Sequence, residues 1–204
     1  TVRSVNGTNK SNYKATSGLC YVVAPKVTVS ITSTGLLAKW NKVNNATSYI
    51  VYRRALVNGV WSSWVNLGST KAEKNTWSDT SVQSGVTYRY TVRAVVGKVK
   101  SGYTSSSSII CLAQPVLKIS NANTGITGKW DPIAGATGYT IYRSEYNPST
   151  KKWSKWLTLG TTGATAKTFT DKTVKSGYEY KYTIRAVSGK FKSTYQDSNK
   201  LVYL

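Results

Sequence analysis

The chain has 204 residues, of which 40% are hydrophobic, and its 28 basic and 7 acidic side chains give a formal net charge of +21. This length fits two small β-domains of about 100 residues each, and the charge favours anionic partners without specifying a fold. His is absent, which excludes catalytic Ser-His and Cys-His pairs. The sequence also contains no run of about 18 apolar residues, the length that predicts a membrane-spanning helix.

The first element of the chain is a phrase that recurs twice. It reads TVRSVNGTNKSNY at residues 1–13, TVRAVVGKVKSGY at 91–103 and TIRAVSGKFKSTY at 183–195. In the later copies it begins inside a strand, and Asn6-Gly7 is predicted to be the hairpin turn. We therefore expect residues 1–22 to be the C-terminal hairpin of a truncated upstream repeat. A cleaved upstream piece or a neighbouring molecule would hold it.

The rest of the chain repeats in the same phase. PKVTVSITSTGLLAKW at residues 25–40 lies over PVLKISNANTGITGKW at 115–130, and WSSWVNLG lies over WSKWLTLG further along. Repetition of this kind indicates two copies of one folding unit, which we place at residues 23–112 and 113–204.

Both copies have β patterns throughout. Apolar and polar residues alternate in VTVSI, YIVY and TYRYTVRAV, and Gly, Asn, Ser and Pro fall between these runs. About seven short strands in roughly 90 residues predict a sandwich of two sheets. The predicted fold class is therefore all-β, with tandem seven-stranded antiparallel β-sandwiches preceded by a partial repeat.

The repeated aromatic residues include candidates for the core. Trp40 and Trp130 close the second strand of each copy and are expected to fill the centre of its core. Tyr88 and Tyr180 end the phrase VxSGxxY, which has the form of a tyrosine corner, in which the hydroxyl bonds backbone a few residues upstream.

These motifs together resemble fibronectin type III domains: Pro at the start, Trp late in the second strand, YxVYR in the third and TxxSDxxVxSGxxYxYxVRAV in the late strands. The version with YRYTVRAV and a short Gly-Lys hairpin is similar to tandem repeats in secreted and surface proteins of Gram-positive Clostridia. The resemblance implies an immunoglobulin-like sandwich and an extracellular, secreted or cell-surface setting. It implies no ligand, because this fold hosts many functions.

No motif for a metal, nucleotide or catalytic site occurs, so we expect no enzyme and no cofactor. Asp79 and Asp171 occupy equivalent positions and are interpreted as turn caps. Cys20 and Cys111 lie one repeat apart, and a strand of about seven residues already spans roughly 23 Å. Bridged Cα atoms lie within about 7 Å, so an intramolecular disulfide is not expected. Free thiols and an intermolecular bridge both stay open.

Two tryptophan pairs mark a candidate binding surface. Residues three apart in an unbroken strand face opposite sides, so Trp61 and Trp153 are expected outside and Trp64 and Trp156 inside. An exposed indole beside Lys could stack on a sugar ring or anchor a protein partner. Alternatively, each Trp covers its own sheet edge or packs on the neighbouring domain.

The pleat adds further residues to this surface. It places Tyr52 and Arg93 on the outer face of the first copy and Tyr142 and Arg185 on that of the second. Aromatic and cationic side chains of this kind stabilise a sheet, and they could also bind a ligand.

The predicted function is a non-catalytic extracellular spacer or adhesion module. Short linkers without Gly or Ser runs favour a restrained array with other domains of a longer parent protein, and the charge favours anionic cell-wall or host polymers. The alternative is specific binding of a carbohydrate or a host protein, such as an immunoglobulin or glycoprotein, through the Trp and Tyr residues. With 21 of the 28 basic residues being Lys and no nucleic-acid motif, nucleic acid is disfavoured.

Overall fold

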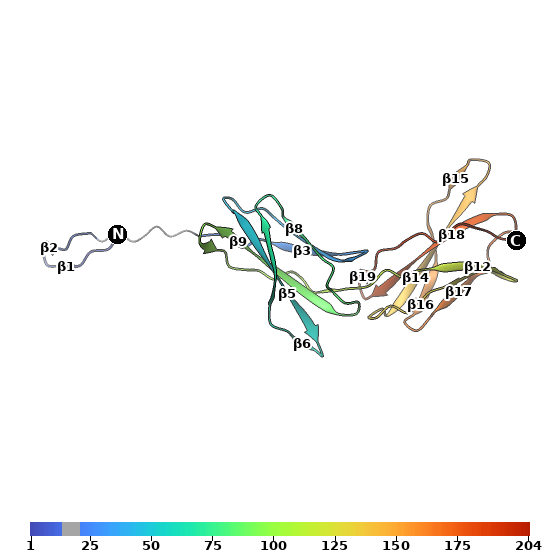
Figure 1. Cartoon of the computed structure of the whole chain (residues 1–204), viewed down its shortest axis with the longest axis horizontal. Coiled ribbons are helices and arrows are strands. Elements are labelled where there is room, and N and C mark those ends of the chain that lie inside the picture. The colour runs from blue at the N-terminus through green and yellow to red at the C-terminus, as the bar shows by residue number, and fades with distance from the viewer. Residues whose placement is uncertain (14–20) are drawn as a thin grey trace.

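The computed structural model describes residues 1–13 and 21–204, and within them it contains strands and no helix. Two β-sandwiches lie end to end along the chain (Figure 1). The predicted all-β class with successive antiparallel sandwiches is confirmed. The exact boundaries at residues 22 and 112 stay a prediction.

The first sandwich has a three-stranded sheet and a larger sheet. The smaller sheet has the order β3 (Val27–Thr32), β4 (Gly35–Trp40), β8 (Thr76–Asp79). The larger sheet consists of β7 (Val65–Lys71), β5 (Ser48–Val57) and β9 (Thr87–Val96), with β6 (Val60–Trp61) on β5 and with β10 (Val99–Lys100) and β11 (Ile109–Ile110) on β9.

The second sandwich repeats this topology. Its smaller sheet is β12 (Lys118–Ala122), β13 (Gly125–Lys129), β17 (Thr168–Asp171). Its larger sheet consists of β16 (Leu157–Gly163), β14 (Gly138–Asn147) and β18 (Glu179–Ser188), with β15 (Lys152–Trp153) on β14 and with β19 (Phe191–Lys192) and β20 (Leu201–Val202) on β18.

The seventh strand of each sandwich is split because serine side chains replace part of its ladder. Ser101 donates its N–H to the carbonyl of Ala94 over 2.8 Å, and its hydroxyl accepts the Ala94 N–H over 3.0 Å. Ser106 makes the same pair of bonds with Tyr90. β10 and β11 are therefore the two ends of one strand.

The N-terminal phrase forms a small hairpin of β1 (Val5–Asn6) and β2 (Asn9–Lys10). Its loop is Gly7-Thr8, so the predicted turn at Asn6-Gly7 is wrong by one residue. Gly7 has a φ of 59°; positive φ at only the first loop residue is typical of a type II′ turn.

The hairpin also carries the serine pairing of the later copies. The Ser11 N–H donates to the Ser4 carbonyl over 3.1 Å, and the Ser4 N–H donates to the Ser11 hydroxyl over 3.0 Å. Ser11 therefore corresponds to Ser101. What holds the hairpin stays a prediction.

The cores form where the alternating side chains of the two sheets meet. Trp40 and Trp130 lie at the centres, 2% and 4% exposed, and each packs on a tyrosine of the third strand. The ring centroids of Trp40 and Tyr49 are 5.6 Å apart, and those of Trp130 and Tyr139 are 5.2 Å apart.

A buried carboxylate joins the two sheets of the first sandwich. Asp79 ends β8 and accepts bonds of 2.8 Å from the Arg53 guanidinium on β5 and from the Tyr90 hydroxyl on β9. Its other oxygen accepts the Ser81 N–H over 3.0 Å, which is the predicted turn cap. We call Asp79, Arg53 and Tyr90 the first inter-sheet clamp.

The second sandwich contains the same arrangement. Asp171 accepts from Arg143 over 2.8 Å and from Tyr182 over 2.9 Å, and these three residues form the second inter-sheet clamp. The sequence predicts the turn caps but not the partners on the opposite sheet.

The corner tyrosines lie beside the clamps. The Tyr88 hydroxyl accepts the Gln83 N–H over 2.9 Å, and the Tyr180 hydroxyl accepts the Lys175 N–H over 2.9 Å. The guanidinium of Arg53 lies 5.2 Å from the centroid of the Tyr88 ring, so the corner and the clamp share one packing unit.

Cys111 belongs to the buried core of the first sandwich and is 4% exposed. Burial raises the pKa of its thiol, and the negative charge of Asp79 adds to that effect. Cys20 lies outside the described residues.

The clamps predict how stability depends on pH. Burial alone would raise the pKa of Asp79, but hydrogen bonds from Ser81, Tyr90 and Arg53 outweigh it and hold that pKa below its usual value. The clamp contribution is therefore complete above about pH 4 and is lost as the pH falls through the folded-state pKa. We expect the thermal unfolding midpoint, followed by circular dichroism, to fall across this range.

Substituting the carboxylates tests this account. The double variant Asp79→Asn, Asp171→Asn should lose about 3 kcal/mol of stability per sandwich at neutral pH and show a much flatter acid limb. The control Asp131→Asn, an exposed carboxylate, should keep the wild-type slope. Equal slopes in the wild type and the double variant would contradict the assignment.

Candidate binding face

The outer face of the larger sheet carries the candidate residues in both sandwiches. Pairing of β5 with β9 sets Tyr52 opposite Thr91 and Arg54 opposite Arg89. Pairing of β14 with β18 sets Tyr142 opposite Thr183. Because side chains at alternate positions share a face, aromatic and cationic groups gather along these strands.

In the first sandwich these groups interleave. The guanidinium carbon of Arg54 lies 4.8 Å from the ring centroids of both Trp61 and Trp64, and that of Arg89 lies 4.7 Å from Trp61. The rings of Trp64 and Tyr103 are 6.5 Å apart. We call these five residues the first ladder.

The expectation that Trp61 faces outside and Trp64 inside is wrong. Both indoles are half-buried and contact the same guanidinium. The strand is interrupted at Ser62, whose hydroxyl accepts the Ala55 N–H over 3.0 Å while its own N–H donates to the Ala55 carbonyl over 2.8 Å. In an extended chain with about three residues per turn, side chains three positions apart point to the same side. Trp61 and Trp64 are separated by three positions and can therefore lie on one face.

The second sandwich contains the same tryptophan pair with a different cation. The ammonium of Lys181 lies 5.0 Å from the ring centroids of both Trp153 and Trp156, so Trp156 is not inside either. The ring of Tyr146 lies 5.4 Å from that of Trp153. Lys181 also binds Asp197 over 2.9 Å.

One difference between the copies changes the shape of the face. Ser144 stands where the first copy has Arg54, and it is buried. The outer face of the second sandwich also contains a shallow pocket of about 190 Å³. Its lining consists of Tyr142, Trp156, Thr183, Arg185 and Tyr195.

The structure separates the predicted binding residues into two groups. Tyr142 and Arg185 line the pocket together, and Tyr52 and Arg93 occupy the matching positions of the first sandwich. Trp61 and Trp153 instead stack on cations of their own sheet. Binding at all six residues stays a prediction.

Three pocket residues, Trp156, Thr183 and Tyr195, are absent from the predicted binding set. The repeated spacing Trp-Ser-x-Trp could have indicated Trp156, because a serine between two aromatic residues favours a break in the strand. Tyr195 ends the phrase that recurs three times, but nothing local places it beside Arg185.

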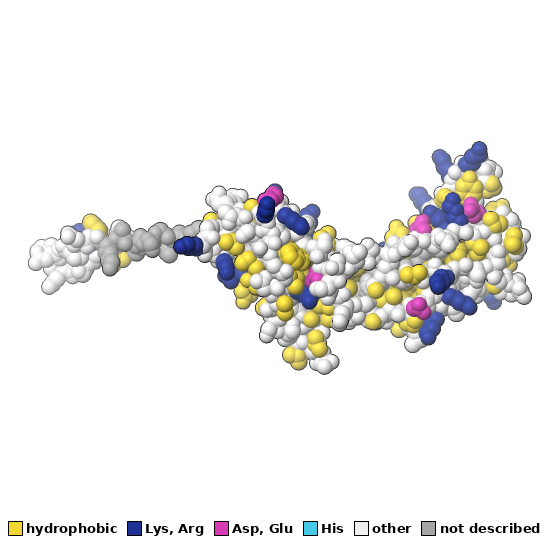
Figure 2. All heavy atoms as spheres, in the orientation of Figure 1, with side chains coloured by type: hydrophobic (Ala, Val, Ile, Leu, Met, Phe, Trp, Pro, Cys, Tyr) yellow, Lys and Arg dark blue, Asp and Glu magenta, His cyan; other side chains and the backbone are white. Residues whose placement is uncertain are grey.

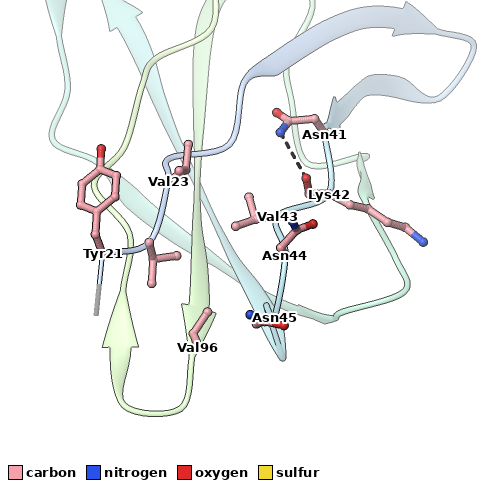
Figure 3. Close-up of a pocket in the computed structure, with 9 residues that line it drawn as sticks. Tyr21, Val23, Asn41, Lys42, Val43, Asn44, Asn45 and Val96 are labelled. Carbon is pink, nitrogen blue, oxygen red and sulfur yellow. Dashed lines mark hydrogen bonds between the residues drawn. The ribbon is translucent and has the colours of Figure 1, made fainter. Parts of the chain in front are cut away.

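A second hollow lies at the N-terminal end of the first sandwich. It has a volume of about 390 Å³ and lies between the segment at Tyr21 and Val23 and the loop at Val43 to Asn45 (Figure 3). Tyr21 is 87% exposed and Val23 is 56% exposed, so this end presents apolar side chains to solvent.

The two sandwiches meet at a compact junction. The Ser84 hydroxyl donates to the Ala134 carbonyl over 2.9 Å and accepts the Ala113 N–H over 3.0 Å. Gly85 and Gly135 lie so close that a Cβ on Gly135 would be 2.3 Å from the Gly85 Cα.

These features define a protein of successive fibronectin type III-like sandwiches with an aromatic and cationic outer face. No helix in the described ranges is long and apolar enough to cross a membrane. Those same ranges contain no cluster of three side chains suited to a metal ion.

Comparison with known proteins supports the fibronectin type III fold of the second sandwich. Residues 115–199 match the family model described as "Fibronectin type III domain SaeA third domain". A two-domain fibronectin type III segment of chicken tenascin is 18% identical at a TM-score of 0.47, covering 88% of this chain and 99% of that one. The chicken interferon gamma receptor alpha chain is 12% identical at a TM-score of 0.42, covering 89% of this chain and 98% of that one. The FN1–FN3 domains of chicken CNTN1 are 14% identical at a TM-score of 0.36, covering 98% of this chain and 73% of that one.

The first ladder should contribute to the stability of its sheet. Replacing Arg54 with Gln removes two cation–π contacts, so we expect opening of β5 and β9 to become about 1 kcal/mol easier. Amide hydrogen exchange of those strands measures this directly. Lys39→Gln, an exposed change on β4, should stay within about 0.5 kcal/mol. If both variants behave alike, the ladder contributes nothing to stability.

Proposed function

We propose that this protein is a non-catalytic extracellular module that spaces and connects domains of a longer protein and associates with anionic polymers at a cell surface. Fibronectin type III folds are binding or spacer modules, so the proposal adds the setting, the charge-driven partner and the mechanical role.

The junction between the sandwiches carries this proposal. A flexible linker would leave the two sandwiches free, whereas here one serine hydroxyl bonds both the linker and the next sandwich. Gln114 in the linker also accepts from the Thr194 hydroxyl over 2.9 Å. The backbones approach so closely at Gly85 and Gly135 that neither position has room for a side chain. Such a junction favours a fixed spacing between the ends.

The free ends of the pair resemble the two halves of that junction. Gly177 corresponds to Gly85, with φ of 80° against 86°, and its N–H donates to the Tyr203 carbonyl as Gly85 donates to Cys111. Asn45 corresponds to Gly135, with a φ of 60°. These ends are suited to receive further sandwiches, which supports a place in an array.

The charge supports the second part of the proposal. Basic side chains lie over both sandwiches and gather at the β15 end of the second, while acidic ones are few (Figure 2). A surface of this kind attracts polyanions over a range set by the salt concentration.

The junction predicts a narrow distribution of distances between the sandwiches. We expect spin labels at Ser30→Cys and Ser120→Cys, with both native cysteines changed to Ser, to give one narrow peak by pulsed electron resonance. Gly85→Ala should broaden it, because the new Cβ would meet the Ala134 backbone at 3.0 Å.

Gly177→Ala is the matched control for that experiment. It imposes the same strain of a positive φ, but its Cβ meets nothing within 4 Å. A broad distribution in the unmodified junction, or equal broadening by both variants, would contradict the spacer proposal.

Association with polyanions should depend steeply on salt. We expect affinity for dextran sulfate, measured by isothermal calorimetry, to fall about tenfold or more between about 50 and 500 mM NaCl. Uncharged dextran should not bind. Affinity that is insensitive to salt, or absent at low salt, would remove this part of the proposal.

A further inference from the structure

We propose that the pocket on the outer face of the second sandwich binds the acidic sugar unit of an anionic glycan. This inference rests on the proposed association with anionic polymers, and it names the chemical class of the polymer and the place where it binds. The pocket is the one lined by Tyr142, Trp156, Thr183, Arg185 and Tyr195.

Arg185 supplies a fixed and unused cation. Its Nε donates to the Ser193 carbonyl over 2.8 Å, and its guanidinium carbon lies 5.6 Å from the centroid of the Tyr195 ring. Ser193 is fully buried, so the guanidinium is held at its base. In the described part of the chain no Asp or Glu pairs with Arg185. The remaining N–H groups can therefore meet a carboxylate in the paired geometry that Arg favours.

Three aromatic rings complete the pocket. Trp156 and Tyr142 come from the β14 side, and Tyr195, 48% exposed, follows β19. Aromatic rings offer apolar faces to the flat C–H faces of a sugar, while their N–H and O–H groups serve as polar handles. The floor is Thr183, which is buried and whose hydroxyl donates to the Gln196 carbonyl over 3.0 Å.

The first sandwich explains why only the second copy is proposed to bind. There the Arg54 guanidinium covers Trp64 at 4.8 Å, and Tyr103 packs on the same indole at 6.5 Å. In the second copy the Ser144 side chain is too short to reach the indole of Trp156, and the cation on that ring is Lys181, whose ammonium lies 5.0 Å from the ring centroid and binds Asp197 over 2.9 Å. Tyr195 and Trp156 make no ring contact of that kind within the described residues. The second copy therefore keeps a pocket lined by Trp156 and Tyr195, whereas the face of the first copy is covered where Tyr103 packs on Trp64.

Size and charge select the ligand. A pocket of about 190 Å³ is smaller than the roughly 300 Å³ at which drug-sized sites begin, and it suits one ring rather than a folded partner. Arg185 is the cation that lines the pocket, whereas Lys181 near Trp156 is paired with Asp197. One unpaired cation beside three rings favours a ring that carries one carboxylate. An acidic peptide shares the charge but lacks the flat ring face.

The test is a calorimetric titration of the full chain with a glucuronic acid-containing tetrasaccharide. Controls are its carboxyl-reduced neutral analogue and tetraglutamate. We expect the acidic sugar to bind, and the neutral analogue and the peptide to bind at least about tenfold more weakly. Arg185→Gln and Tyr195→Ala should each weaken binding of the acidic sugar about tenfold or more.

The first sandwich supplies matched control variants. Arg93→Gln and Tyr103→Ala make the same changes at the covered face and should leave the affinity unchanged. Tyr195 is largely exposed, so its variant keeps the fold, as an unchanged circular dichroism spectrum would show. Equal effects of the Arg185 and Arg93 variants, equal binding of the neutral sugar, or tighter binding of tetraglutamate would overturn the inference.

These outcomes are separable from those of the proposed function. If dextran sulfate binds in a salt-dependent way but Arg185→Gln leaves the sugar affinity unchanged, the pocket assignment fails and the charge-driven association stands. If dextran sulfate does not bind while the acidic sugar binds through Arg185, the pocket stands and the diffuse association fails.

Discussion

The buried carboxylate of each inter-sheet clamp is the constraint around which the rest of the sandwich is arranged. A carboxylate can stay charged when it is buried only if hydrogen bonds and an opposite charge replace the water that it loses. Asp79 therefore requires Arg53 and Tyr90 from the other sheet, at 2.8 Å each. These bonds fix β8 against β5 and β9. The corner tyrosine packs on the same guanidinium, so the turn before β9 is fixed as well.

Because the inner side is fixed in this way, the two copies can differ on the outside without loss of the fold. Both clamps have nearly the same geometry, and both cores centre on a Trp beside a Tyr. The outer faces differ at Arg54 and Ser144. Tyr103 packs on Trp64 in the first copy, whereas Tyr195 and Trp156 line a pocket in the second. Ser84 and Gly85 of the junction likewise lie in the corner motif, so the connection to the next sandwich and the corner share one segment.

The sequence was sufficient to predict the strands, the faces of most strand residues and the two copies of the folding unit, because alternation and repetition are local or periodic signals. It also placed Trp40 at the core and Tyr52 outside. It was insufficient for the clamp partners, because Arg53 lies 26 residues and Tyr90 lies 11 residues from Asp79 along the chain. It misplaced Trp64, because a serine hydroxyl that replaces a ladder bond interrupts the strand and changes which side each residue faces.

The central claim is that a common clamped core supports two different outer faces, with the proposed binding pocket at Trp156 and Tyr195 of the second copy. Indole N–H resonances during titration with the acidic tetrasaccharide test it most directly, since each Trp reports its own site. The account predicts that the Trp156 resonance moves while Trp64 and the core residues Trp40 and Trp130 stay in place. Equal movement of Trp64 and Trp156, or movement of the core resonances, would contradict it.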